Sequence, residues 1–169
     1  MPLYEESVVL KLEANAGHME PFNGKDVPLQ DRYFKGSDTF RGFMRSGVGP
    51  RQIANDGTVD SIGGTSYAIG TIELNFPLGL PDDWGIEGAV FSDFGTVFGA
   101  PEKTVAAGVD GCTVASCTVF DTAELRASIG AGIIWQSPFG PLRFEAAYPI
   151  VKASYDETEW FRFSIGTRF

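Results

Sequence analysis

Two carboxylates and one guanidinium carry the chemistry that this sequence suggests. Glu73 and Asp93 lie on the polar side of two alternating segments that follow each other along the chain. Neighbouring strands of a sheet are about 4.8 Å apart, so a single planar Arg side chain can bind both carboxylates. Arg41, in the long segment before them, is the candidate partner. The alternative is a solvated Arg41 in a surface loop.

Catalytic chemistry finds little support in the sequence. The pairs Glu73 with Asp93 and Glu124 with Glu145 have the composition of glycoside hydrolase acid pairs, but such pairs facing a charged interior are more often structural. No glycine-rich phosphate loop precedes a helical pattern. A metal site needs more ligands than His18, the single histidine, offers nearby. We therefore predict no catalytic residue, no metal and no cofactor.

Six segments with two-residue alternation must position the charged groups. Such alternation is typical of strands with one apolar face and one polar face. The six segments are residues 7–16, 65–76, 86–98, 124–136, 142–150 and 160–169. An aromatic content of 13% and 21 glycines also favour strands over helices. We predict an all-β fold, an antiparallel meander of about six strands.

The overall composition excludes several classes of protein. The net charge of −9 over 169 residues excludes nucleic acid as a partner, because phosphate binding requires an excess of Lys and Arg. An apolar content of 43% excludes a disordered chain. The longest uncharged run, residues 127–142, contains two prolines and is too short for a membrane-spanning helix. No apolar signal sequence follows Met1, so an exported protein is expected to begin farther upstream.

The connections and the charges distinguish two all-β architectures. Short turns at residues 77–85 and 137–141 alternate with long loops at 17–64 and 99–122, as in outer-membrane barrels. Charges of both signs on the polar face suit a water-filled lumen, and aromatic residues near strand ends suit interfacial girdles. A soluble β-sandwich produces the same alternation and is the alternative.

Two cysteines, Cys112 and Cys117, lie in the glycine-rich loop at residues 99–122. Their short separation suits a small disulfide ring, and oxidation is expected in an exposed loop of an outer-membrane protein. We predict a disulfide, with free thiols as the alternative.

Five motifs stand in order along the chain. They are residues 31–43 with the following 47–51, then 72–77, 91–98, 137–144 and 163–169. Their residue types and their order resemble the bacterial surface antigen family, the BamA-like outer-membrane barrel assembly factors. Members of that family usually have Val before the Arg-Gly-Phe sequence, where this chain has Phe40.

The resemblance implies a fold and a set of site residues. The chain would be the C-terminal part of a sixteen-stranded transmembrane β-barrel, with residues 17–64 as a loop inside the lumen. Ten further strands and periplasmic POTRA domains would precede it. The implied site residues are the lumen-loop motif Arg41, Gly42 and Phe43, the Arg41 ion-pair partners Glu73 and Asp93, and the β-signal residues Phe163, Ser164, Gly166 and Phe169.

The resemblance also implies a function in the bacterial outer membrane that is not enzymatic. The full-length protein would fold and insert β-barrel proteins by edge-strand pairing and lateral opening of its own barrel. Its partners would be outer-membrane lipid, unfolded outer-membrane β-barrel substrates and accessory assembly lipoproteins. The alternatives are a related two-partner-secretion or TamA-type translocator, and a soluble β-sandwich binding module.

Overall fold

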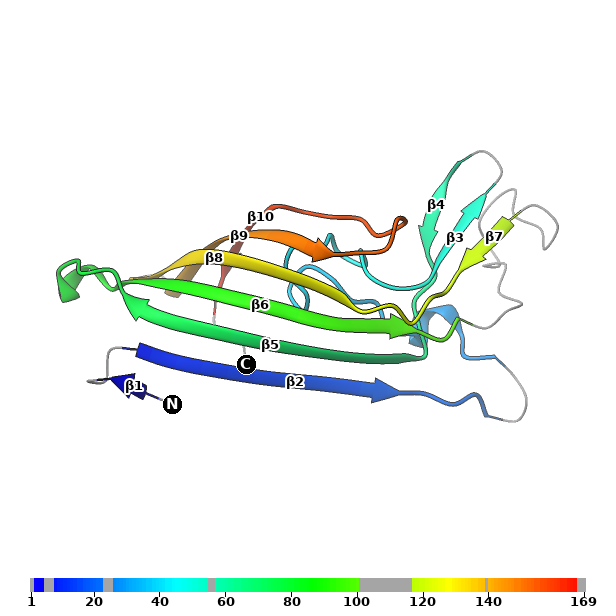
Figure 1. Cartoon of the computed structure of the whole chain (residues 1–169), viewed down its shortest axis with the longest axis horizontal. Coiled ribbons are helices and arrows are strands. Elements are labelled where there is room, and N and C mark those ends of the chain that lie inside the picture. The colour runs from blue at the N-terminus through cyan, green and yellow to red at the C-terminus, as the bar shows by residue number, and fades with distance from the viewer. Residues whose placement is uncertain are drawn as a thin grey trace.

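The computed structural model describes residues 2–4, 8–22, 26–54, 57–100, 117–138 and 140–166. Within these residues the chain forms strands and two short 3-10 turns, η1 (Leu29–Asp31) and η2 (Asp82–Trp84). Seven strands form one antiparallel sheet in the order β1-β2-β5-β6-β8-β9-β10, and three form a second sheet in the order β4-β3-β7 (Figure 1). Nothing helical in the described part has the length and apolarity that crossing a membrane requires. The predicted all-β antiparallel fold is confirmed.

The main sheet contains the six strands that the alternation predicts. Its long strands are β2 (Val8–His18), β5 (Ser66–Pro77), β6 (Ile86–Phe98), β8 (Arg126–Ser137), β9 (Gly140–Val151) and the shorter β10 (Phe161–Ile165). They run side by side as one curved wall (Figure 1). Their ends lie within two residues of the prediction, except that β10 ends at Ile165 and residues 167–169 lie outside the described part. A further short strand, β1 (Pro2–Tyr4), pairs with the start of β2 and was not predicted.

The two long loops contain secondary structure that the sequence analysis missed. β3 (Arg51–Ala54) and β4 (Val59–Ser61) form a hairpin in the first loop, and β7 (Cys117–Phe120) of the second loop pairs with β3. These strands have three or four residues each, which is too few for alternation to be recognised. Pairing them satisfies backbone groups that a bare loop would leave without partners. Figure 1 shows this small sheet at one end of the wall, opposite the tight turns.

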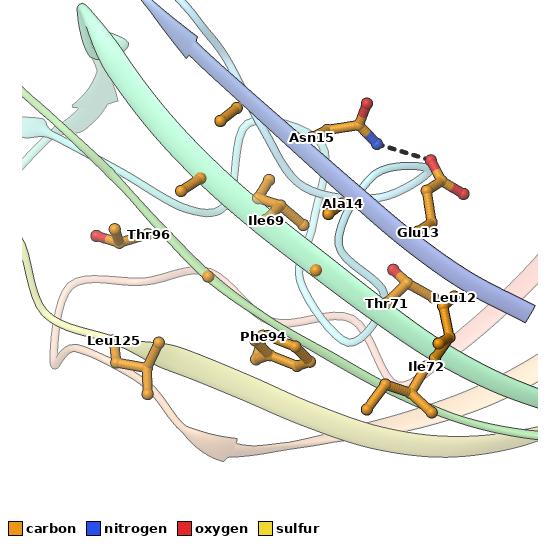
Figure 2. Close-up of a pocket in the computed structure, with 14 residues that line it drawn as sticks. Leu12, Glu13, Ala14, Asn15, Ile69, Thr71, Ile72, Phe94, Thr96 and Leu125 are labelled. Carbon is orange, nitrogen blue, oxygen red and sulfur yellow. Dashed lines mark hydrogen bonds between the residues drawn. The ribbon is translucent and has the colours of Figure 1, made fainter.

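The two faces of the wall differ in chemistry, as the alternation requires. The apolar face is uncovered: Leu12 is 67% exposed and Ile165 68%, and Ile129, Ile133 and Phe163 are about half exposed. On this face Leu12, Ile72, Phe94 and Leu125 surround a hollow of about 670 Å³ (Figure 2). No second layer of the described chain seals it. The β-sandwich alternative is therefore wrong, because a soluble sandwich would bury this face.

The buried core lies on the polar side of the wall. There the first long loop, residues 17–64, folds back over the sheet, and its Phe40, Phe43 and Val48 pack with Ile69 of β5 and Val97 of β6. All five residues are at most 7% exposed. We call residues 17–64 the lumen loop, after the loop of the family that they resemble. Its packing fixes the position of Arg41, which lies between two of these core residues.

Candidate functional site

Arg41 lies at the tip of the lumen loop and is 2% exposed. Its guanidinium forms a two-pronged ion pair with Asp93, through Nε to Oδ2 at 2.8 Å and through Nη2 to Oδ1 at 2.7 Å. The backbone N–H of Arg41 donates to the same carboxylate at 2.9 Å. Nη1 donates to Glu73 Oε2 at 2.6 Å. The structure thus brings together the three residues that the sequence analysis singled out.

The strand register explains why these two carboxylates converge. Asp93 of β6 is opposite Thr71 of β5, and Glu73 is opposite Phe91. Glu73 and Asp93 are therefore diagonal neighbours on the same face, within reach of one long side chain. Thr71 also donates its hydroxyl to Asp93 Oδ1 at 2.9 Å, which fixes the orientation of that carboxylate.

The sequence analysis missed two further members of the site, both on β9. Glu145 accepts a hydrogen bond from Arg41 Nη1 at 2.9 Å, and Arg143 Nη2 donates to Glu73 at 2.9 Å and to Glu145 at 3.0 Å. Alternation already placed Glu145 and Arg143 on the polar face. Alternation does not predict the curvature of the sheet. This curvature brings β9 across the lumen side towards β5. Glu124, once considered with Glu145 as a carboxylate pair, is exposed.

We call the five charged residues the Arg41 cluster: Arg41, Glu73, Asp93, Arg143 and Glu145. Burial alone would lower the pKa of Arg41, but its hydrogen bonds and ion pairs with Asp93, Glu73 and Glu145 outweigh that effect. The net result is a pKa of Arg41 raised above its ordinary value. The arginine therefore stays charged, and the cluster joins the lumen loop to three strands of the wall.

An aromatic ring forms the floor of the cluster. The Cζ atom of Arg41 lies 3.4 Å from the centre of the Phe91 ring, a stacked cation–π contact. Gly130 of the neighbouring strand leaves room for that ring, since a Cβ atom there would lie 2.3 Å from Phe91 Cζ. A larger residue at position 130 would therefore displace the ring on which Arg41 rests.

The rest of the Arg41-Gly42-Phe43 motif closes the loop tip against the wall. Ser128 of β8 donates its hydroxyl to the Arg41 carbonyl at 2.5 Å. Gly42 has φ +89°, a conformation that favours glycine, and a Cβ atom there would lie 3.1 Å from that of Ser128. Phe43 packs edge-on against Phe40 with ring centres 4.8 Å apart. Phe40, where the family usually has Val, is therefore part of the packed tip.

A second buried arginine site lies near the opposite end of β8 from the tight turn. Arg126 is fully buried and donates to Asp156 at 3.0 Å, to the Thr122 and Glu124 carbonyls, and to the Tyr155 hydroxyl. It joins the start of β8 to the connection between β9 and β10. Sequence periodicity contains no signal for this contact, since Asp156 lies outside any strand.

Three basic residues of the lumen loop had no predicted role. Lys35 lies over the Tyr67 ring, with Nζ 3.9 Å from its centre. Arg51 is buried, pairs with Glu157 at 3.1 Å and donates to the Ser46 carbonyl. Arg45 is exposed.

The predicted β-signal and disulfide are only partly described. Phe163 lies on the apolar face of β10 and packs at a tilt against Phe144 of β9, with ring centres 4.9 Å apart. Gly166, at φ +107°, follows the strand and donates its N–H to the Pro141 carbonyl at 2.9 Å. Phe169, Cys112 and the side chain of Cys117 lie outside the described residues. Within the described residues, no three His, Cys, Asp or Glu side chains are arranged to hold a metal.

Comparison with known proteins decides the family. Residues 1–169, the whole chain, match the Omp85 superfamily domain. The chain belongs to the Omp85 superfamily. This Omp85 chain is 34% identical over 167 residues to the outer membrane protein assembly factor BamA of Neorickettsia risticii, covering 99% of the chain and 20% of that protein. It is 31% identical over 156 residues to the BamA of Neisseria meningitidis serogroup B, covering 86% of the chain and 19% of that protein.

A solved structure agrees with the sequence comparison. The crystal structure of Haemophilus ducreyi BamA lacking POTRA domains 1–3 superimposes on this Omp85 chain with a TM-score of 0.75 and 30% identity, covering 95% of this chain and 31% of that one. The predicted family and its outer-membrane location are confirmed. The chain spans about a fifth of the length of the curated relatives it matches.

Proposed function

We propose that this chain is the C-terminal wall segment of an outer-membrane barrel assembly factor. The long strands, the uncovered apolar face and the charged inner face support a place in a transmembrane barrel. The edge strands of an open sheet have backbone N–H and C=O groups without hydrogen-bond partners, and lipid cannot supply these partners. Further strands must therefore complete the barrel. POTRA domains and the remaining strands would belong to the same polypeptide.

The observation that carries this function is the attachment of the lumen loop to three wall strands through the Arg41 cluster. A loop held in this way occupies the lumen and reduces its use as an open pore. We therefore place the activity of such a barrel at the edges of its strands. No observation favours a translocator of the two-partner-secretion or TamA type over an assembly factor.

The edge that would act is that of β10. Among the described strands it pairs with β9 alone, through five residue pairs. When the barrel seam opens, this edge would present free backbone donors and acceptors. The C-terminal strand of an unfolded barrel substrate would add to it by β-augmentation. The process requires neither a catalytic residue nor a cofactor; accessory lipoproteins and outer-membrane lipid would be its other partners.

Insertion into vesicles tests this function directly. The full-length protein is reconstituted into lipid vesicles, and a urea-unfolded β-barrel substrate is added. We expect the substrate to become folded and protease-protected at least ten times faster than in empty vesicles. Vesicles containing an unrelated porin serve as the control. Equal rates in the two kinds of vesicle would contradict the proposed function.

A further inference from the structure

The connection between β9 and β10 pairs with the lumen loop. Phe43 and Thr158 form an isolated antiparallel bridge. Met44 N–H donates to the Glu157 carbonyl at 3.0 Å, and Glu159 N–H donates to the Gly42 carbonyl at 3.1 Å. Glu157 N–H in turn donates to the Gly47 carbonyl at 3.1 Å. The chain that leads into β10 is therefore attached to the loop tip.

β10 itself is attached to the same loop through one side chain. Arg162, the second residue of β10, donates from Nη1 to the Ser37 hydroxyl and from Nη2 to Asp38. The crevice between the loop tip and the start of β10 has a volume of only about 10 Å³. We call these contacts, of Ser37, Asp38 and residues 42–47 with residues 157–162, the latch.

The latch and the Arg41 cluster differ in burial. In the cluster, the Arg41, Glu73, Asp93 and Glu145 side chains are each at most 3% exposed. In the latch, the one ion pair is that of Arg162 with Asp38, and the Asp38 side chain is 70% exposed. Ion pairs open to water contribute little stability, whereas breaking a buried pair leaves an uncompensated charge. Opening the latch therefore leaves no fully buried charge without a partner, whereas opening the Arg41 cluster would.

We propose that the lumen loop holds the last strand through this latch, and that the latch opens during substrate insertion while the Arg41 cluster stays closed. This inference rests on the function proposed above. Among the described residues, β10 is joined to β9 by five residue pairs, whereas β8 and β9 share eleven. Three backbone hydrogen bonds to the loop and the Arg162 contacts add to what keeps β10 in place. Movement of β10 towards a substrate strand therefore requires the latch to separate.

A reversible cross-link tests whether the latch must open. Met44 and Glu157 are both exposed, flank the Phe43–Thr158 bridge and are joined by the backbone hydrogen bond from Met44 N–H, so they are the pair chosen for a disulfide. The variant is Met44→Cys with Glu157→Cys, in the full-length protein with its native cysteines replaced by serine. Oxidised, it is expected to insert substrate at least ten times more slowly than after reduction. Each single cysteine variant is expected to respond to neither treatment.

A matched disulfide in the wall is the control. Ala131 and Ala146 are opposite each other on β8 and β9, away from the loop. The variant with cysteine at both positions is expected to insert substrate at the same rate whether it is oxidised or reduced. If the oxidised Met44–Glu157 variant inserts within twofold of its reduced form, the latch proposal is overturned and the proposed function stands. If the unmodified protein does not accelerate insertion, both are overturned.

Hydrogen exchange provides a second readout that does not depend on activity. Arg162→Gln removes the charge that pairs with Asp38, so the amides of β10 are expected to exchange several times faster. Amides of β8 are expected to exchange at unchanged rates. The charge-reversed double variant Asp38→Arg with Arg162→Asp is expected to restore slow exchange. Unchanged exchange in β10 of the Arg162→Gln variant would also overturn the latch.

Discussion

Replacing Arg41 with alanine in the full-length protein is expected to destabilise the barrel by roughly 3–5 kcal/mol. The change leaves Glu73, Asp93 and Glu145 buried near one another with Arg143 as the remaining cation. It also removes the stacking on Phe91. The midpoint of urea unfolding in detergent micelles measures the loss. Limited proteolysis is expected to show new cleavage in the lumen loop, since its tip is released from the wall.

Arg45→Ala is the matched control for Arg41→Ala. Arg45 lies in the same loop and carries the same charge, but it is exposed. Exposed substitutions usually change stability by about 0.5 kcal/mol or less. Arg41→Lys is expected to fall between the two, because an ammonium cannot form the two-pronged pair with Asp93. An Arg41→Ala protein with the unfolding midpoint and loop protection of the Arg45→Ala protein would contradict the assigned role.

Replacing Asp93 with alanine is expected to cost a similar amount, roughly 3–5 kcal/mol. Asp93 accepts hydrogen bonds from the Arg41 side chain, the Arg41 backbone and Thr71, so its removal leaves several buried donors without an acceptor. Urea unfolding measures this loss as well. Asp83→Ala, in an exposed turn of the same wall, is the control and is expected to change little.

The two substitutions are also expected to be strongly non-additive. Once Arg41 is absent, removing Asp93 takes away a buried charge that has lost its partner. The double variant Arg41→Ala with Asp93→Ala is therefore expected to be less destabilised than the sum of the single variants, by at least about 1 kcal/mol. Additive losses would mean that the two side chains act on stability separately.

Strand positions were predictable because one physical rule governs them. Residues of β6 alternate between lipid and water, so the period-two pattern alone locates Ile86–Phe98. The rule fails for β3, β4 and β7, which are too short to show a period. The period-two rule also cannot predict that the lumen loop and the second long loop pair through Arg51 and Phe120. That pairing depends on where the two loops lie in space.

The site was predictable in part for a related reason. Alternation placed Glu73, Asp93 and Glu145 on one face, and the resemblance to a known family supported Arg41 as the partner of Glu73 and Asp93. Whether a residue on that face reaches Arg41 depends on register and curvature, which is why Glu145 was missed. The Arg126–Asp156 contact joins a strand end to a connection, and no periodic pattern reports such a pair.

In the complete barrel we expect the apolar face of this wall to meet lipid and the polar face to meet water in an occupied lumen. Nitroxide labels on single cysteines in the reconstituted full-length protein test it most directly. At the outward positions Leu12, Ile129 and Ile133 we predict high accessibility to oxygen, which concentrates in lipid, and low accessibility to a water-soluble nickel complex. At the inward positions Glu13 and Asn15 we predict the reverse. Labels at Leu12 and Glu13 that respond alike to oxygen and nickel would contradict this orientation of the two faces.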